Sequence, residues 1–123
     1  MAGINIGENS QIEDNCVVHT AVPMIIGDNV HIGHSAVIHC SKIGNNVLIG
    51  NNTTILDQAE IGDFCIIGAN SLISRGMKIP TNSFAVGAPA EIKGEATKEQ
   101  LASLEKSIQI YIELTEEYKG QGL

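Results

Sequence analysis

The sequence predicts an all-β solenoid, a parallel β-helix of about four to five triangular coils, followed by a C-terminal α-helix. Aliphatic residues recur every six positions over most of the chain, and the period becomes helical near the C-terminus. Glycine is frequent, with 13 residues, whereas aromatic residues make up only 3%. This composition suits stacked short strands better than a bulky core. We expect residues 1–90 to form the β-helix and residues 91–123 to form a linker and the helix.

The six-residue period defines the strands. One repeat unit is a short strand and a turn, and three units make one triangular coil of about 18 residues. Because side chains alternate along a strand, the aliphatic residue points inward and its neighbours point outward. Small residues four places further on, including Cys16 and Cys65, are expected inside at the corners. The inward aliphatic positions are 6, 12, 18, 26, 32, 38, 43, 49, 55, 61, 67, 73 and 79.

Residues 96–118 have the pattern of an amphipathic helix. Thr97 and Gln100 have the spacing of a capping box at its start. We expect the apolar stripe of this helix to pack on the β-helix or on a neighbouring subunit. Helical spacing places five residues on that stripe, namely Leu101, Leu104, Ile108, Tyr111 and Tyr118.

Charge and hydropathy exclude several classes of partner. The net charge is −7 at neutral pH, so nucleic acid and anionic membrane are poor partners. No apolar run reaches about 18 residues, and no basic-then-apolar leader is present, so we expect a cytoplasmic protein. Three cysteines do not indicate a disulfide framework.

Three histidines occupy related positions in the repeat. His19 and His39 each follow the inward residue that ends a coil, so we expect them on one outer face, one strand spacing of about 4.8 Å apart. That separation allows two imidazoles to bind one metal ion. His34 follows Ile32 by two places and belongs to another side of the coil. We therefore expect His34 of one copy to join His19 and His39 of the next, in a closed trimer.

Three neutral imidazoles leave a fourth position for water, as in catalytic zinc sites. The metal would lower the pKa of that water toward about 7 and supply hydroxide at neutral pH. A plain surface role is the alternative for any one of these outward histidines. His31 also faces outward and is expected at the surface or beside the ligands. Cys40 adjoins His39 and is a further candidate for metal contact.

The segments that carry these histidines resemble the γ-class carbonic anhydrase-like family of hexapeptide-repeat proteins. The resemblance lies in residues 12–19, 26–40, 49–50 and 55–57, where His19, His34 and His39 match the ligand pattern of the family. It implies a left-handed β-helix and a homotrimer with zinc, or iron or cobalt, between subunits. It also implies attack of a metal-bound hydroxide on CO2 to give bicarbonate, a lyase (carbonate dehydratase) reaction.

The chain departs from the family pattern at three places. One is the segment from Thr20 to Met24, which is short and has no acidic residue, so the glutamate-bearing loop of some members is absent. The chain also begins after the position of the usual Arg-Gly-Asp segment, so the resemblance describes an N-terminally short member whose activity is open. Glu13 stands where the family usually has Gln. As the predicted catalytic residue, Glu13 could be a base or proton relay, or could strengthen metal binding, and a solvated surface position is the alternative. By the same resemblance, Asp14 is expected to orient a ligand or a turn, and Tyr111 is expected to approach the site, although the sequence by itself places Tyr111 in the core.

Two other functions remain open at this stage. One is a hexapeptide acyltransferase or thioesterase acting on a CoA ester, in which a histidine serves as base between subunits without a metal triad. The other is a non-catalytic metal-binding scaffold. Stoichiometric zinc without acetyl-CoA binding favours the anhydrase over the transferase, and bound metal without CO2 hydration indicates the scaffold.

Overall fold

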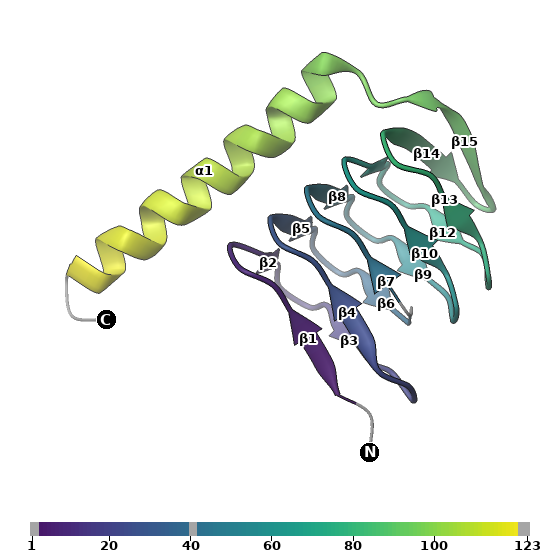
Figure 1. Ribbon diagram of the computed structural model, residues 1–123, viewed down its shortest axis with the longest axis horizontal. Helices are drawn as coiled ribbons and strands as arrows, with labels where there is room; N and C mark the ends of the chain where they lie inside the picture. Colours follow the sequence, from purple (N-terminus) through teal and green to yellow (C-terminus); the bar gives the residue numbers. More distant parts are fainter. Residues whose placement is uncertain (1–2, 40–41, 121–123) are drawn as a thin grey trace.

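The computed structural model describes residues 3–39 and 42–120, with side chains described through residue 117. Over these residues the chain winds into a left-handed parallel β-helix with three faces, which an antiparallel strand follows at one end (Figure 1). A single long helix then runs back alongside the coils. The predicted fold class is therefore confirmed.

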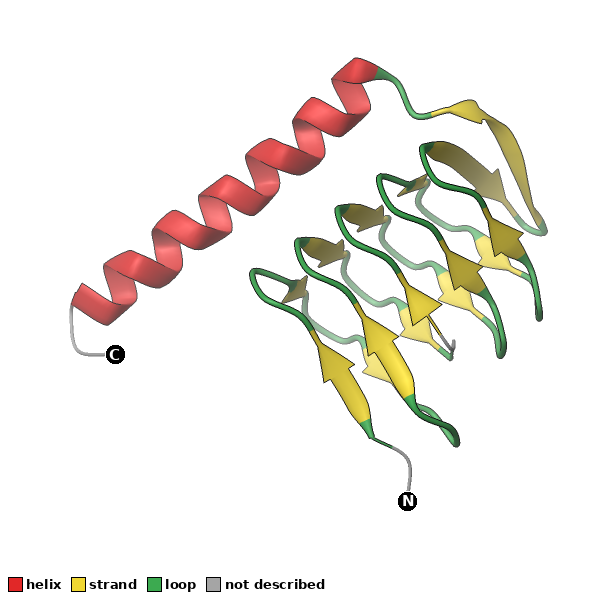
Figure 2. Ribbon diagram, viewed as in Figure 1, coloured by secondary structure: helices red, strands yellow, loops and turns green. Residues whose placement is uncertain are grey.

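Each face of the β-helix is one sheet, and neighbouring strands in a sheet come from successive coils (Figure 2). The first sheet contains β1 (Ile4–Ile6), β4 (Met24–Ile26), β7 (Lys42–Ile43), β10 (Glu60–Ile61) and β13 (Lys78–Ile79). The second contains β2 (Gln11–Ile12), β5 (Val30–Ile32), β8 (Val47–Ile49), β11 (Ile66–Ile67), β14 (Ser83–Gly87) and β15 (Ala90–Glu95). The third contains β3 (Val17–Val18), β6 (Val37–Ile38), β9 (Thr54–Ile55) and β12 (Leu72–Ile73).

The inward aliphatic residues stack in register along the axis. In the second sheet, Ile32, Ile49 and Ile67 pair in successive coils, and each is at most 1% exposed. The corner residue Cys65 is fully buried, as predicted. In the first coil, by contrast, Ile6 is 46% exposed, because a neighbouring coil packs against it on one side only.

The corners of the coils depend on a left-handed backbone conformation. One residue in most turns has a positive φ, and Asn fills this position most often. Asn tolerates the left-handed region better than most residues with a side chain. The six-residue spacing of Asn is thus a second signal of the repeat. The positions are Asn9, Asn15, Asn29, Ser35, Asn46, Asn52, Gln58, Phe64, Asn70 and Asn82.

The end of the β-helix differs from the prediction. We expected a linker after residue 90, but Ala90–Glu95 form strand β15, which pairs antiparallel with β14. Helix α1 (Lys98–Gly120) follows. Its capping box is confirmed, since the Thr97 N–H donates to Gln100 Oε1 at 2.8 Å and the Gln100 N–H donates to Thr97 Oγ1 at 3.1 Å.

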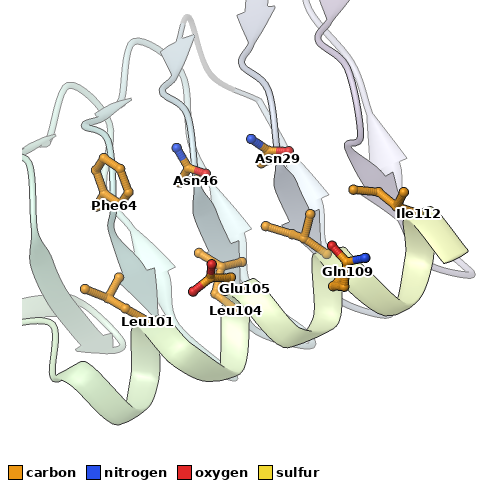
Figure 3. A pocket seen from close by; sticks show the side chains of 9 residues that line it. Asn29, Asn46, Phe64, Leu101, Leu104, Glu105, Gln109 and Ile112 are labelled. Atoms are coloured by element: carbon orange, nitrogen blue, oxygen red, sulfur yellow. The ribbon is translucent and has the colours of Figure 1, made fainter.

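Helix α1 lies along the second sheet. Packing on the β-helix was one of the two predicted arrangements. Leu104 is 2% exposed, and the helix contacts β5. A hollow of about 360 Å³ remains between the helix and the coil corners, next to Phe64 and Leu101 (Figure 3). Within the described residues, α1 lacks the long apolar stretch that a membrane-crossing helix needs.

Candidate metal centre

The third sheet brings His19 and His39 together. Val18 pairs with Ile38, and the ladder continues through the two histidines. The His19 N–H donates to the Ile38 carbonyl at 3.1 Å, and the His39 N–H donates to the Ile55 carbonyl at 2.7 Å. The two imidazole rings stack with centroids 4.8 Å apart and planes at 27°. The predicted neighbour relationship and its spacing are confirmed.

Asp57 holds one of these two rings. Its Oδ1 lies 3.1 Å from Nδ1 of His39. A carboxylate only accepts hydrogen bonds, so Nδ1 is the donor, and in the neutral ring Nε2 keeps a free lone pair. Asp57 was not predicted as a site residue, although it directly follows Leu56, which occupies the His39 position of the next coil. A hollow of about 350 Å³ lies here, lined by His19, Thr20, Ala21, Val22, His39, Asp57 and Gln58.

His34 stands at a corner on another side of the coil. Its N–H donates to Asn51 Oδ1 at 2.7 Å. The preceding residue is Gly33, where an added Cβ would lie 2.3 Å from the same Asn51 oxygen. Gly33 therefore allows Asn51 to fix the backbone of His34. The His34 side chain is 55% exposed and is accessible from outside.

Glu13 lies beside His34, as predicted. Its N–H donates to the Ile32 carbonyl at 3.0 Å, which places it one coil below. Glu13 Oε2 is 3.5 Å from His34 Nε2. Its other oxygen, Oε1, accepts a hydrogen bond from Gln11 Nε2 and lies 3.3 Å from His31 Nε2. Gln11 pairs with His31 in the ladder between β2 and β5, a register that could have identified Gln11 from the repeat.

His31 is more enclosed than a surface residue. Its side chain is 20% exposed, and Nδ1 is buried without a hydrogen-bond partner in the described part of the chain. Burial lowers the pKa of His31 below its ordinary value, and the Glu13 carboxylate opposes part of that shift. The neutral imidazole is the form that this environment favours.

Three further residues were predicted near the metal site, namely Asp14, Tyr111 and Cys40. The Asp14 carbonyl accepts a hydrogen bond from the N–H of Ser35, the residue after His34, at 3.0 Å. Tyr111 lines a small hollow with Asn9, Ile112, Thr115 and Glu116. Cys40 falls outside the described residues. The roles suggested for Asp14 and Tyr111 therefore stay predictions.

One copy of the chain does not bring the three predicted metal ligands together. Across residues 3–39 and 42–120, no three His, Cys, Asp or Glu side chains converge closely enough to hold a metal ion. His19 and His39 project from the end of the third-sheet strands, whereas His34 and Glu13 follow strands of the second sheet. This separation agrees with the expectation that the three histidines do not meet within one subunit.

Comparison with known proteins places the chain in a family. The model of the family described as "Bacterial transferase hexapeptide (six repeats)" matches residues 23–57 and 40–75. A probable carbonic anhydrase of Methanocaldococcus jannaschii is 48% identical over 115 residues, which cover 92% of this chain and 72% of that protein. The chain belongs to the γ-carbonic anhydrase-like family of hexapeptide-repeat proteins.

Two further relatives show the extent of the similarity. Gamma carbonic anhydrase 2, a mitochondrial protein of Arabidopsis thaliana, is 32% identical over 92% of this chain, which spans only 44% of that protein. The crystal structure of a hexapeptide transferase family protein from Anaplasma phagocytophilum has a TM-score of 0.86 at 36% identity. That match covers 94% of this chain and 69% of the other.

Proposed function

We propose that this protein is a metal-dependent carbonic anhydrase of the γ type, which hydrates CO2 to bicarbonate at sites shared between copies of the chain. The single observation that carries the proposal is the stacked pair of His19 and His39, 4.8 Å apart on an outer face. The relatives named carbonic anhydrases support the same reaction.

The side chains present fit zinc. Imidazole nitrogen is a preferred zinc ligand, at about 2.0–2.1 Å, and iron or cobalt accepts the same donors. In His39 the Asp57 hydrogen bond leaves Nε2 free to bind. His34 is exposed on another side and supplies the third nitrogen from a second copy. Heterologous contacts of this kind close into a ring, and we propose a homotrimer with three sites.

Each residue then has a distinct task. His19, His39 and His34 hold the ion, and Asp57 keeps the His39 ring in one orientation. A zinc ion held in this way acts as a Lewis acid that makes hydroxide available at neutral pH. Glu13 Oε2 lies 3.5 Å from His34 Nε2, so we assign it the acceptance of a proton from water. We propose that Asp14 and Tyr111 support this arrangement. From the sequence we also propose a cytoplasmic location.

The direct test is stopped-flow CO2 hydration with purified protein of known metal content. We expect stoichiometric zinc, iron or cobalt together with hydration activity. The variant His34→Ala should lose both. Equal metal content in the wild type and in this variant would show that the ligand assignment is wrong.

A hexapeptide acyltransferase or thioesterase is the second candidate, since the family model and a similar crystal structure carry transferase names. The experiment that separates the two is acetyl-CoA binding measured by calorimetry. Zinc without acetyl-CoA binding favours the anhydrase, and the reverse result favours the transferase. Bound metal with neither activity indicates a non-catalytic scaffold.

A further inference from the structure

Glu13 presents its two carboxylate oxygens to different surroundings. Oε1 accepts the hydrogen bond from Gln11 and lies 3.3 Å from His31 Nε2. Oε2 lies 3.5 Å from His34 Nε2. The Glu13 side chain is 20% exposed, whereas His34 is 55% exposed. One oxygen is thus held by the Gln11 side chain, and the other faces an exposed imidazole.

The distance between Glu13 Oε2 and His34 Nε2 is long for a hydrogen bond. A charge-assisted N–H···O contact with a carboxylate measures about 2.7–2.9 Å. Two atoms that bind one tetrahedral zinc ion, each at about 2.0–2.2 Å, lie roughly 3.3–3.6 Å apart. The observed 3.5 Å fits the second case. We infer that Glu13 Oε2 is itself a metal ligand next to His34, an inference that rests on the metal site proposed above.

His34, rather than His31, shares the ion with Glu13 because of what surrounds each ring. The oxygen that faces His31 already accepts a hydrogen bond from Gln11, and the His31 side chain is mostly enclosed. The exposure of His34 leaves room for the ion and for two imidazoles of a second copy. A ligating carboxylate whose other oxygen is held by neighbouring donors is well oriented for binding, and Gln11 and His31 surround Oε1 in this way.

A fourth protein ligand changes what the site does at rest. Three imidazoles and one carboxylate fill the tetrahedral coordination of zinc, as in closed sites. A small molecule then reaches the metal only after Glu13 has released it. The oxygen assigned to proton acceptance therefore also controls access to the metal.

The test uses full-length protein, freed of metal by chelation and reconstituted with cobalt(II). Azide binds an open coordination position and changes the visible spectrum of cobalt. We expect millimolar azide to leave the wild-type spectrum unchanged and to alter the spectrum of Glu13→Gln. Zinc should bind Glu13→Gln about 100-fold more weakly, at the upper end of the loss seen when a group beside a ligand is removed. Glu8→Gln removes the same charge from the same coil and should behave as wild type.

Two other outcomes would overturn the role of Glu13, and they distinguish it from the metal site itself. An azide response of equal size in wild type and Glu13→Gln would overturn the role of Glu13, while loss of metal from His34→Ala would still support the shared site. Wild-type protein that binds neither zinc nor cobalt would overturn the metal site and the role of Glu13 together. Circular dichroism and oligomeric mass check that each variant is folded, and Glu13→Ala provides a second variant for the same comparison.

Discussion

Asp57 Oδ1 accepts a hydrogen bond from Nδ1 of His39 across 3.1 Å, between successive coils of the β-helix. The contact fixes both the tautomer and the orientation of a proposed metal ligand. Neither effect requires Asp57 to touch the metal. Such supporting contacts commonly strengthen metal binding about 10–100-fold.

Replacing Asp57 should therefore weaken metal binding without removing it. For Asp57→Ala we expect a zinc dissociation constant about 10–100-fold higher, measured by competition with a chromophoric chelator. Asp57→Asn keeps an oxygen acceptor and should lie between the two. Long-range ¹⁵N NMR of the metal-free protein should show His39 protonated at Nδ1 in wild type. A mixture of tautomers in the wild type would contradict the assignment.

Mixing two inactive variants tests whether sites lie between subunits. His34→Ala and His39→Ala should each lose bound zinc, because each removes one ligand from every site. When the two are unfolded together and refolded in equal amounts, one subunit of some pairs supplies His34 and its neighbour supplies His39. About one quarter of the interfaces in a ring are then intact. Metal analysis that finds no recovery in mixed oligomers would place all ligands within one chain.

Gly33 should resist substitution because Asn51 packs where a side chain would begin. A Cβ at Gly33 would lie 2.3 Å from Asn51 Oδ1 and 2.8 Å from the Asn51 backbone nitrogen. We expect Gly33→Ala to lower the free energy of unfolding by about 1–3 kcal/mol, measured by urea denaturation. Gly3→Ala is the matched control, since no atom lies within 4 Å of its Cβ position. An equal effect at the two positions would argue against this packing.

The stability of the metal-free protein should depend on the protonation of His31. Burial lowers the pKa of His31 in the folded state, whereas the unfolded chain titrates near about 6.5. Between these two values the unfolded state binds more protons, so the free energy of unfolding falls as the pH drops below about 6.5. The contribution levels off below the folded-state pKa.

The variant His31→Gln isolates this contribution. Urea denaturation between pH 7.5 and pH 5 should show a smaller loss of stability for the variant than for wild type. Identical pH profiles for the two proteins would show that His31 does not titrate differently in the folded and unfolded states.

Much of the fold could be read from the sequence because its signals are local and repeated. The six-residue period placed Ile32 and Ile49 inside and the histidines outside, since alternation along a strand leaves only two directions. The spacing of His19 and His39 followed from the same regularity and agrees with the 4.8 Å ring separation. Thr97 and Gln100 marked the start of α1, because the hydrogen bonds between them join residues only three positions apart.

What the sequence did not determine depends on contacts between coils and on side-chain conformation. Strand β15 was missed because Ala90–Glu95 follow no repeat and become a strand only by pairing with β14. The hydrogen bond from His39 to Asp57 and the enclosure of His31 arise where loops and ladders bring distant residues together. The direction of each Glu13 oxygen depends on Gln11 and His31. The repeat determined which face each residue occupies, and the tertiary packing decided which atoms on that face meet.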